Sequence, residues 1–352
     1  MRKYLELFKE GFPSDMSDRT AIENWPYVGH DINGGVVYTV VPKPVVNGPW
    51  VTFTAEEDNS SIGLAKLSTY QTFEYSTDTT TWNAFDTTTN IPLNNGDKVY
   101  VRGILSDNNN TSYYTQFKMT GKIAASGNCN ALWNYEDLTA PLKAYCGFNM
   151  FSKCASLTTA PELPATTLSE HCYYGMFSKC ASLTTAPELP ATTLSEGCYY
   201  NMFSGCSSLA TAPELSVTTL FEDCYSSMFN GCTSLTTAPI LPATELADYC
   251  YSAMFYGCTS LTVAPELPAT TMAHGCYQYM FRGCTSLTTA PILPATELAG
   301  GCYYEMFRGC TSLTTAPILP ATELADYCYQ HMFRDCTSLT TAPELSATEL
   351  AH

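Results

Sequence analysis

Cysteine is the residue whose number and spacing in this chain most suggest chemistry. Sixteen of the 17 cysteines fall into two series with a step of 26 residues, and Cys129 lies outside both. The first series is Cys146, Cys172, Cys198, Cys224, Cys250, Cys276, Cys302 and Cys328, and the second is Cys154, Cys180, Cys206, Cys232, Cys258, Cys284, Cys310 and Cys336. Such thiols could bind a metal, form disulfides or pack as small apolar side chains.

The spacing favours cysteines that pack as small apolar side chains. The two cysteines of one repeat are separated by seven residues, which is not a zinc-ligand spacing, and no histidine recurs with them. The opening MRKYLELFKEGFPSD lacks the features of a signal peptide, which favours reduced thiols. We therefore expect buried, reduced thiols, no metal and no cofactor, with disulfides between neighbouring repeats as the alternative.

The histidines and carboxylates form no catalytic pattern. The five histidines occupy different positions in their repeats, and no hydrolase, metalloprotease or nucleotide-binding motif occurs. One glutamate recurs at an equivalent position in most repeats, with Ile at 240, 292 and 318; its members are Glu162, Glu188, Glu214, Glu266 and Glu344. An evenly spaced row indicates a solvated edge rather than the two distinct carboxylates of a glycosidase. Calcium binding by the row is the alternative. We expect a protein that is not an enzyme.

The charge of the chain excludes two classes of partner. The net charge is −17, and no basic patch is present to neutralise phosphates or anionic lipids. No apolar run reaches the roughly 18 residues that a membrane helix requires. We expect neither nucleic-acid binding nor membrane insertion.

The structural unit that repeats every 26 residues must position the cysteines and the glutamate row. This period predicts a solenoid of eight units over residues 142–352. Within one unit, Leu246, Cys250 and Met254 are four apart and predict a short helix that ends at Gly257. Ser234–Ala238 predicts a short strand, because two prolines follow it closely.

The recurring stretch MFxGCTSLTTAPELPATTLAxxCY resembles the BspA-type leucine-rich repeats of Bacteroides surface proteins. The resemblance implies a non-enzymatic solenoid that is exported and used for adhesion to proteins or host surfaces. The units differ from one another mainly beside their Met-Phe pair, so ligand contacts are expected there. The candidate ligand-binding residues are Tyr256, Gln278, Tyr279, Arg282, Arg308, Gln330, His331 and Arg334. The regular Thr-Thr positions indicate sheet packing, with an ice-binding array as the alternative.

Residues 50–121 predict a β-sandwich of the immunoglobulin or fibronectin class. Strands are expected at Val51–Thr54, Phe73–Tyr75, Lys98–Arg102 and Tyr113–Met119. The run FEYSTDTTTWNAF…LNNGDKVYVRG resembles sandwich modules that precede such repeats in Bacteroides surface and phage proteins. Trp82 and Tyr100 are expected in its core, with a ligand platform as the alternative. Residues 122–141, with Cys129 and Trp133, are expected to cap the solenoid.

Residues 1–49 predict a docking segment that is too small for a core of its own. A helix is expected over Asp15–Asn24 and a hairpin around Asn33-Gly34-Gly35, with Trp25, Tyr27 and Tyr38 as anchor residues. The segment resembles the N-terminal segments of virion proteins in crAss-like Bacteroides phages.

The predicted fold class is therefore mainly β with short helices: a docking segment, a β-sandwich and an α/β solenoid. The leading hypothesis is a phage virion component, a fibre or decoration protein. It would bind virion proteins through residues 1–49 and a host-surface protein or glycan through the solenoid, as a possible trimer. A bacterial surface adhesin and a purely structural spacer are the alternatives.

Overall fold

The computed structural model describes residues 28–32, 35–39 and 48–347. The chain divides into two compact units, residues 1–48 and 49–352, and each is described by itself. In the first unit, β1 (Val28–Ile32) pairs with antiparallel β2 (Gly35–Thr39), which confirms the predicted hairpin. The helix predicted at residues 15–24 and the anchor residues Trp25 and Tyr27 lie outside the described residues, as does the side chain of Tyr38.

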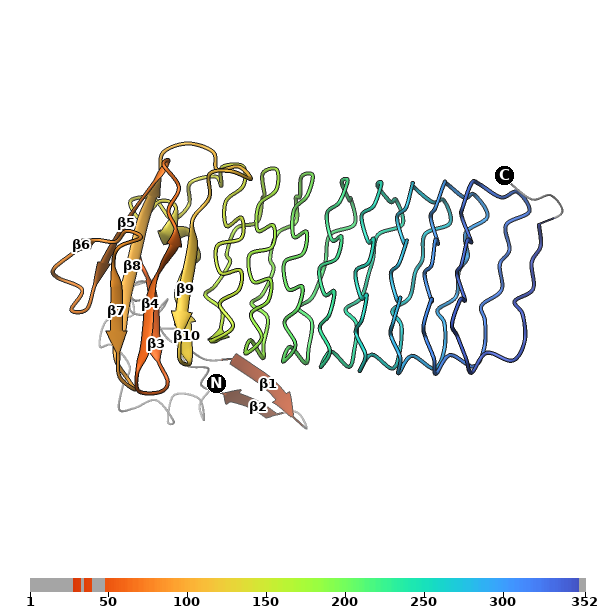
Figure 1. The fold of residues 1–352 in the computed structure, drawn as a ribbon, viewed down its shortest axis with the longest axis horizontal. Helices are drawn as coiled ribbons and strands as arrows, with labels where there is room; N and C mark the ends of the chain where they lie inside the picture. Colours follow the sequence, from red (N-terminus) through yellow and green to blue (C-terminus); the bar gives the residue numbers. More distant parts are fainter. Residues whose placement is uncertain (1–27, 33–34, 40–47, 348–352) are drawn as a thin grey trace. The chain divides into compact units, whose positions relative to one another are not determined.

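The second unit begins with two sheets, which we call the two-sheet module (residues 51–126; Figure 1). One sheet has the strand order β11-β10-β3-β8-β5-β6 and the other β7-β4-β9. The strands are β3 (Val51–Ala55), β4 (Ser60–Lys66), β5 (Gln71–Ser76), β6 (Asn83–Ala84), β7 (Asn90–Leu93), β8 (Lys98–Leu105), β9 (Gln116–Thr120), β10 (Ile123–Ser126) and, from the first repeat, β11 (Leu157–Thr159). Every pairing is antiparallel except β10 with β11, where the module joins the repeats.

The prediction that Trp82 and Tyr100 lie in the core is wrong. The core of the module contains four phenylalanines, at positions 53, 73, 85 and 117. Strand β8 buries Val99 and Val101, so Tyr100 between them points to the other face. There Tyr100 and Trp82 are half-buried beside Trp50, at ring-centroid distances of 5.9 and 5.7 Å.

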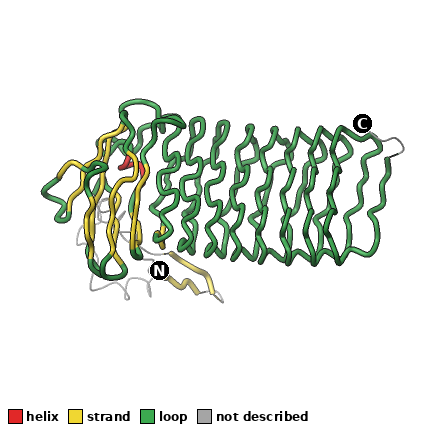
Figure 2. Tube along the Cα trace, viewed as in Figure 1, coloured by secondary structure: helices red, strands yellow, loops and turns green. Residues whose placement is uncertain are grey.

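The short α-helices predicted for the repeats are absent from the described residues. The helical element among them is a single 3-10 turn, Cys129–Leu132, which precedes the repeats. Figure 2 shows the repeat region almost entirely as turns and loops. Nevertheless Cys250 and Met254 of the predicted helical pattern are fully buried, and Leu246 is partly buried against the same core.

A left-handed residue at every fourth position explains this outcome. Tyr249, Ala253 and Gly257 have φ angles of 55°, 51° and 69°, which a right-handed helix cannot contain. The backbone N–H of Ser252 donates to the carbonyl of Tyr249, three residues back, at 3.0 Å. The N–H of Ala253 instead donates to the carbonyl of Gln278 in the next repeat, at 2.8 Å. The four-residue turn reproduces the burial period of a helix, and the sequence pattern does not distinguish them.

The predicted repeat strands are reduced to single bridges. Among the described repeats, Leu157–Thr159 is the one assigned strand, because it pairs with β10. Beyond it, isolated parallel bridges join one position in successive turns: Thr159, Thr185, Thr211, Thr237, Val263, Thr289 and Thr315. A proline two residues further on lacks the N–H that would extend each bridge into a ladder.

Ladders of identical side chains fill the interior of the repeats. The phenylalanine ladder runs from Phe151 to Phe333, with ring centroids 5.5–5.8 Å apart and planes within 4–7°. A tyrosine ladder runs beside it from Tyr173 to Tyr329, with centroids 5.7–5.9 Å apart. All 17 cysteines are buried as free thiols, which confirms the packing predicted for the sixteen cysteines of the two series.

The two-sheet module supplies the first rung of these ladders. Phe117 of β9 stacks on Phe151 at 5.0 Å, and its N–H donates to the carbonyl of Met150 at 2.8 Å. The thiol of Cys154 donates to the carbonyl of Phe117, as the thiol of Cys180 does to that of Phe151. Trp133 packs in turn on Tyr173, with the ring centroids 6.0 Å apart. The start of the repeats is thus covered by β9 as well as by the predicted segment with Trp133.

The buried thiols make the repeats sensitive to alkaline pH. Burial raises the pKa of Cys154, Cys206 and Cys258 to about 12, and raises that of most other cysteines. Unfolded thiols ionise from about pH 8.5, so the unfolded chain loses protons first. We expect the free energy of unfolding, measured by urea denaturation under reducing conditions, to fall steadily above about pH 8.5. Recovery on return to neutral pH is the control, and a flat profile would contradict the prediction.

Candidate functional site

The eight predicted ligand-binding residues lie in three neighbouring columns, because residues 26 positions apart occur in adjacent turns. Tyr256, Arg282, Arg308 and Arg334 form the first column; Tyr279 and His331 belong to the second, and Gln278 and Gln330 to the third. The last repeat exposes Gln330, His331 and Arg334, whereas the other five residues are half-buried. The repeat therefore places all eight on one stretch of surface, which we call the variable face.

Arg282 makes the central contacts of this face. Its guanidinium lies 5.3 Å from the ring centroid of Tyr256 in the preceding turn and 5.6 Å from that of Tyr279. An arginine held over aromatic rings is ordered at little cost and keeps donors free for a ligand.

Glu305 is one of the residues of this face that the sequence patterns did not reveal. Its carboxylate is 5% exposed and accepts from Arg282 Nη1 at 2.6 Å and from Arg308 Nη1 at 2.9 Å. The equivalent residues Asn201 and Ala253 are uncharged. The appearance of an acidic residue at this position of the repeat could therefore have marked Glu305 as a functional candidate. A buried carboxylate between two guanidinium groups fixes their positions.

The ion pairs continue to the last described turn. Arg308 Nε lies 3.4 Å from Asp335 Oδ2, and Arg334 Nε lies 3.8 Å from the same oxygen. The three arginines are thus balanced by two carboxylates, and the face carries cationic groups with fixed orientation rather than a diffuse basic patch.

Aromatic side chains extend the face away from the arginines. Tyr304, which was not predicted, meets Tyr279 edge to face, with ring centroids 5.2 Å apart. His331 follows at 6.3 Å from Tyr304. Partial burial, and to a smaller extent the neighbouring Tyr304, raise the pKa of Tyr279 above its ordinary value. Its hydroxyl is therefore a neutral hydrogen-bonding group at neutral pH.

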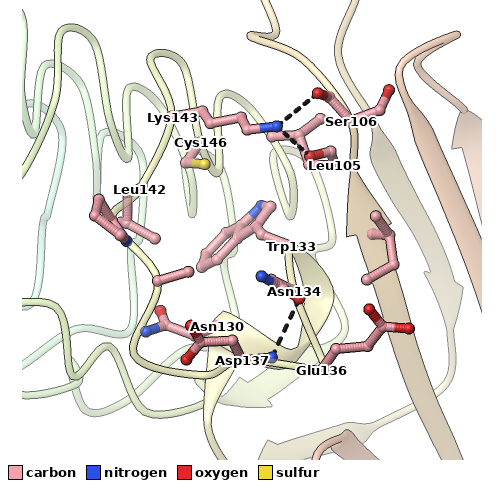
Figure 3. A pocket seen from close by; sticks show the side chains of 13 residues that line it. Leu105, Ser106, Asn130, Trp133, Asn134, Glu136, Asp137, Leu142, Lys143 and Cys146 are labelled. Carbon is pink, nitrogen blue, oxygen red and sulfur yellow. Dashed lines mark hydrogen bonds between the residues drawn. The ribbon is translucent and has the colours of Figure 1, made fainter.

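A cavity of about 280 Å³ lies where the two-sheet module meets the first repeat (Figure 3). Trp133 points into it, and the Trp133 indole N–H has no hydrogen-bond partner among the described residues. Lys143 Nζ donates to the carbonyls of Leu105 and Ser106 at 2.7 and 2.6 Å (Figure 3). The ammonium group therefore ties the first repeat to the end of β8, and the cavity belongs to a structural joint.

The glutamate row is exposed throughout, which confirms the predicted solvated edge. The isoleucines that replace glutamate in it, at 240, 292 and 318, are 66–83% exposed. Within residues 28–32, 35–39 and 48–347, no three His, Cys, Asp or Glu side chains come together as a metal site. The same residues contain no helix with the length and apolar character needed to cross a membrane.

Glu305 should stabilise the last turns through its two ion pairs. We expect Glu305→Gln, which keeps the shape and the left-handed backbone, to lower the free energy of unfolding by about 2 kcal/mol, a value reduced for the partial exposure of the arginines. Urea denaturation measures the change. The matched control is Glu266→Gln in the exposed row, where the effect should stay within about 0.5 kcal/mol. Equal effects in the two variants would contradict the assigned role.

The repeats match a known protein family. Residues 133–262 and 251–344 match the family model described as a BspA type leucine-rich repeat region, in 6 copies. Together the two ranges span more than half of the 352 residues. Neither a curated protein nor a solved structure matches the chain. The chain belongs to the BspA-type leucine-rich-repeat family.

Proposed function

We propose that this protein is a non-enzymatic adhesion protein that recognises a ligand on a biological surface through its variable face. The observation that carries the proposal is the cluster of Tyr256, Tyr279 and Glu305 around Arg282, built over successive turns. The interior ladders repeat with little change, whereas these exposed columns differ from turn to turn. Change confined to the surface of a regular scaffold is typical of recognition.

The absence of enzymatic activity is part of the proposal. Each cysteine is buried, and burial raises the pKa of nearly all of them, which leaves little thiolate to act as a nucleophile. The charged cluster of the variable face is an arginine–carboxylate network, in which both carboxylate oxygens of Glu305 accept from arginine donors and so order the side chains.

We also propose roles for the parts that surround the variable face. Residues 50–121 act as an immunoglobulin- or fibronectin-type module that starts an eight-turn solenoid. Residues 1–49 attach the protein to a larger assembly through Trp25, Tyr27 and Tyr38, with a trimer as the expected oligomer.

The binding role is tested with fluorescently labelled protein on epithelial and bacterial cells, measured by flow cytometry. We expect the triple variant Tyr256→Ala, Tyr279→Ala, Arg282→Ala to bind at least about tenfold more weakly, because such residues dominate binding energies. The matched control is Thr184→Ala, Thr236→Ala, Thr288→Ala, which removes three exposed side chains from the threonine columns. Equal binding by both variants would show that the variable face is not the contact surface. That result would favour a purely structural spacer.

Two locations fit the proposed binding role. Family membership favours a bacterial cell surface, and the resemblance of the N-terminal segment favours a virion. Peptide mass spectrometry of purified phage particles beside washed cells of the source culture separates them. Peptides at stoichiometric abundance in the particles would support the virion component, and peptides confined to the cell envelope would support the adhesin.

A further inference from the structure

An open groove of about 520 Å³ adjoins the variable face in the last repeats. It spans three consecutive turns, and its lining includes Gln278, Tyr279 and Gln330, which the sequence singled out as ligand-binding. The volume falls in the usual range for small-molecule sites, about 300–1,000 Å³.

Glycine opens this groove by leaving out a side chain that other turns carry. Gly301 occupies the first left-handed position of its turn, where Tyr145, Tyr249 and Tyr327 stand in three other turns and glycine stands again at 197 and 275. In two of those turns the tyrosine ring covers the next turn: Tyr145 contacts the ring of His171 at 4.7 Å between centroids, and Tyr249 lies against Gly275. A Cβ atom added at Gly301 would meet no atom within 4 Å. The groove is therefore a gap in a column of side chains, and it is open to a ligand.

The walls of the groove combine aromatic rings with unused hydrogen-bonding groups. Tyr279 and Tyr304 present rings that are held edge to face, and Tyr327 is 62% exposed. Across residues 48–347, the structure gives no hydrogen bond to the side chains of Asp326 and Gln330. A carboxylate offers acceptors and an amide offers both donors and acceptors.

We propose that this groove binds an uncharged sugar ring of a surface glycan. A pyranose has an apolar C–H face that fits against tyrosine rings, and hydroxyl groups at its edge that pair with Asp326, Gln330 and the imidazole of His274. The carboxylate of Asp326 and the net charge of −17 disfavour carboxylated or sulfated sugars. The inference rests on the proposed adhesion function and names the class of its ligand.

The test uses saturation-transfer difference NMR on the full chain with methyl glycosides of glucose, galactose, mannose, N-acetylglucosamine and N-acetylgalactosamine. We expect saturation transfer to at least one of them, and loss of about tenfold or more of that signal in Gly301→Tyr, because the added ring fills the groove. The matched control is Asp223→Tyr. It places the same side chain at the equivalent left-handed position, before a tyrosine in the next turn, outside the groove. Both variants should keep the wild-type circular dichroism spectrum.

A second variant tests the polar wall without filling the groove. Gln330→Ala removes an exposed side chain, and we expect roughly fivefold weaker binding of the same glycoside, which corresponds to the loss of one hydrogen bond. The absence of saturation transfer to all five glycosides, or equal transfer in Gly301→Tyr and wild type, would overturn the inference.

Competition on cells separates this inference from the adhesion function beneath it. Inhibition of cell binding by the glycoside identified by NMR would support both. Cell binding that no glycoside reduces, and that survives enzymatic removal of glycans, would identify a protein ligand and overturn the sugar site while adhesion stands. Saturation transfer without any cell binding would support the sugar site and count against adhesion.

Discussion

Hydrogen bonding between turns is the constraint on which the repeat region depends. Left-handed residues at every fourth position direct alternate backbone N–H groups along the stack, so that Ala253 and Phe255 donate to the carbonyls of Gln278 and Met280 in the next turn. An unpaired buried N–H is costly, and a single turn cannot satisfy its own. Each turn therefore folds only against a neighbour, and the ring ladders add apolar burial to the same contact.

A stack built in this way requires a surface on which to start. The two-sheet module provides it with Phe117, which continues the phenylalanine ladder, and with β10, which pairs with the first repeat strand. Trp133 does the same for the tyrosine ladder. Because sheet and repeats share one continuous hydrophobic core, the module is part of the folding unit of the repeats and more than a separate stem.

The same constraint explains how such a regular scaffold acquires a binding surface. Interior positions are fixed by the ladders, and the exposed columns beside them can vary without disturbing the stack. Residues 26 positions apart become neighbours, so Arg282 and Arg308 converge on Glu305 from consecutive turns. Gly301, in a column that holds tyrosine in three other turns, opens a groove by the same logic. Few substitutions are then enough to assemble a recognition site.

The sequence by itself determined the period, the buried columns, the packing role of the cysteines and four strands of the two-sheet module (β3, β5, β8 and β9), because these follow from residue spacing. It also singled out the positions that vary between repeats. It did not separate a helix from a four-residue turn, since both bury every fourth residue and only the backbone φ of Tyr249 and its equivalents decides between them. Glu305 and the groove at Gly301 also depended on tertiary structure. The partners of Glu305 and the empty space beside Gly301 are set by side chains from adjacent turns, and such lateral contacts exist only once the turns are stacked.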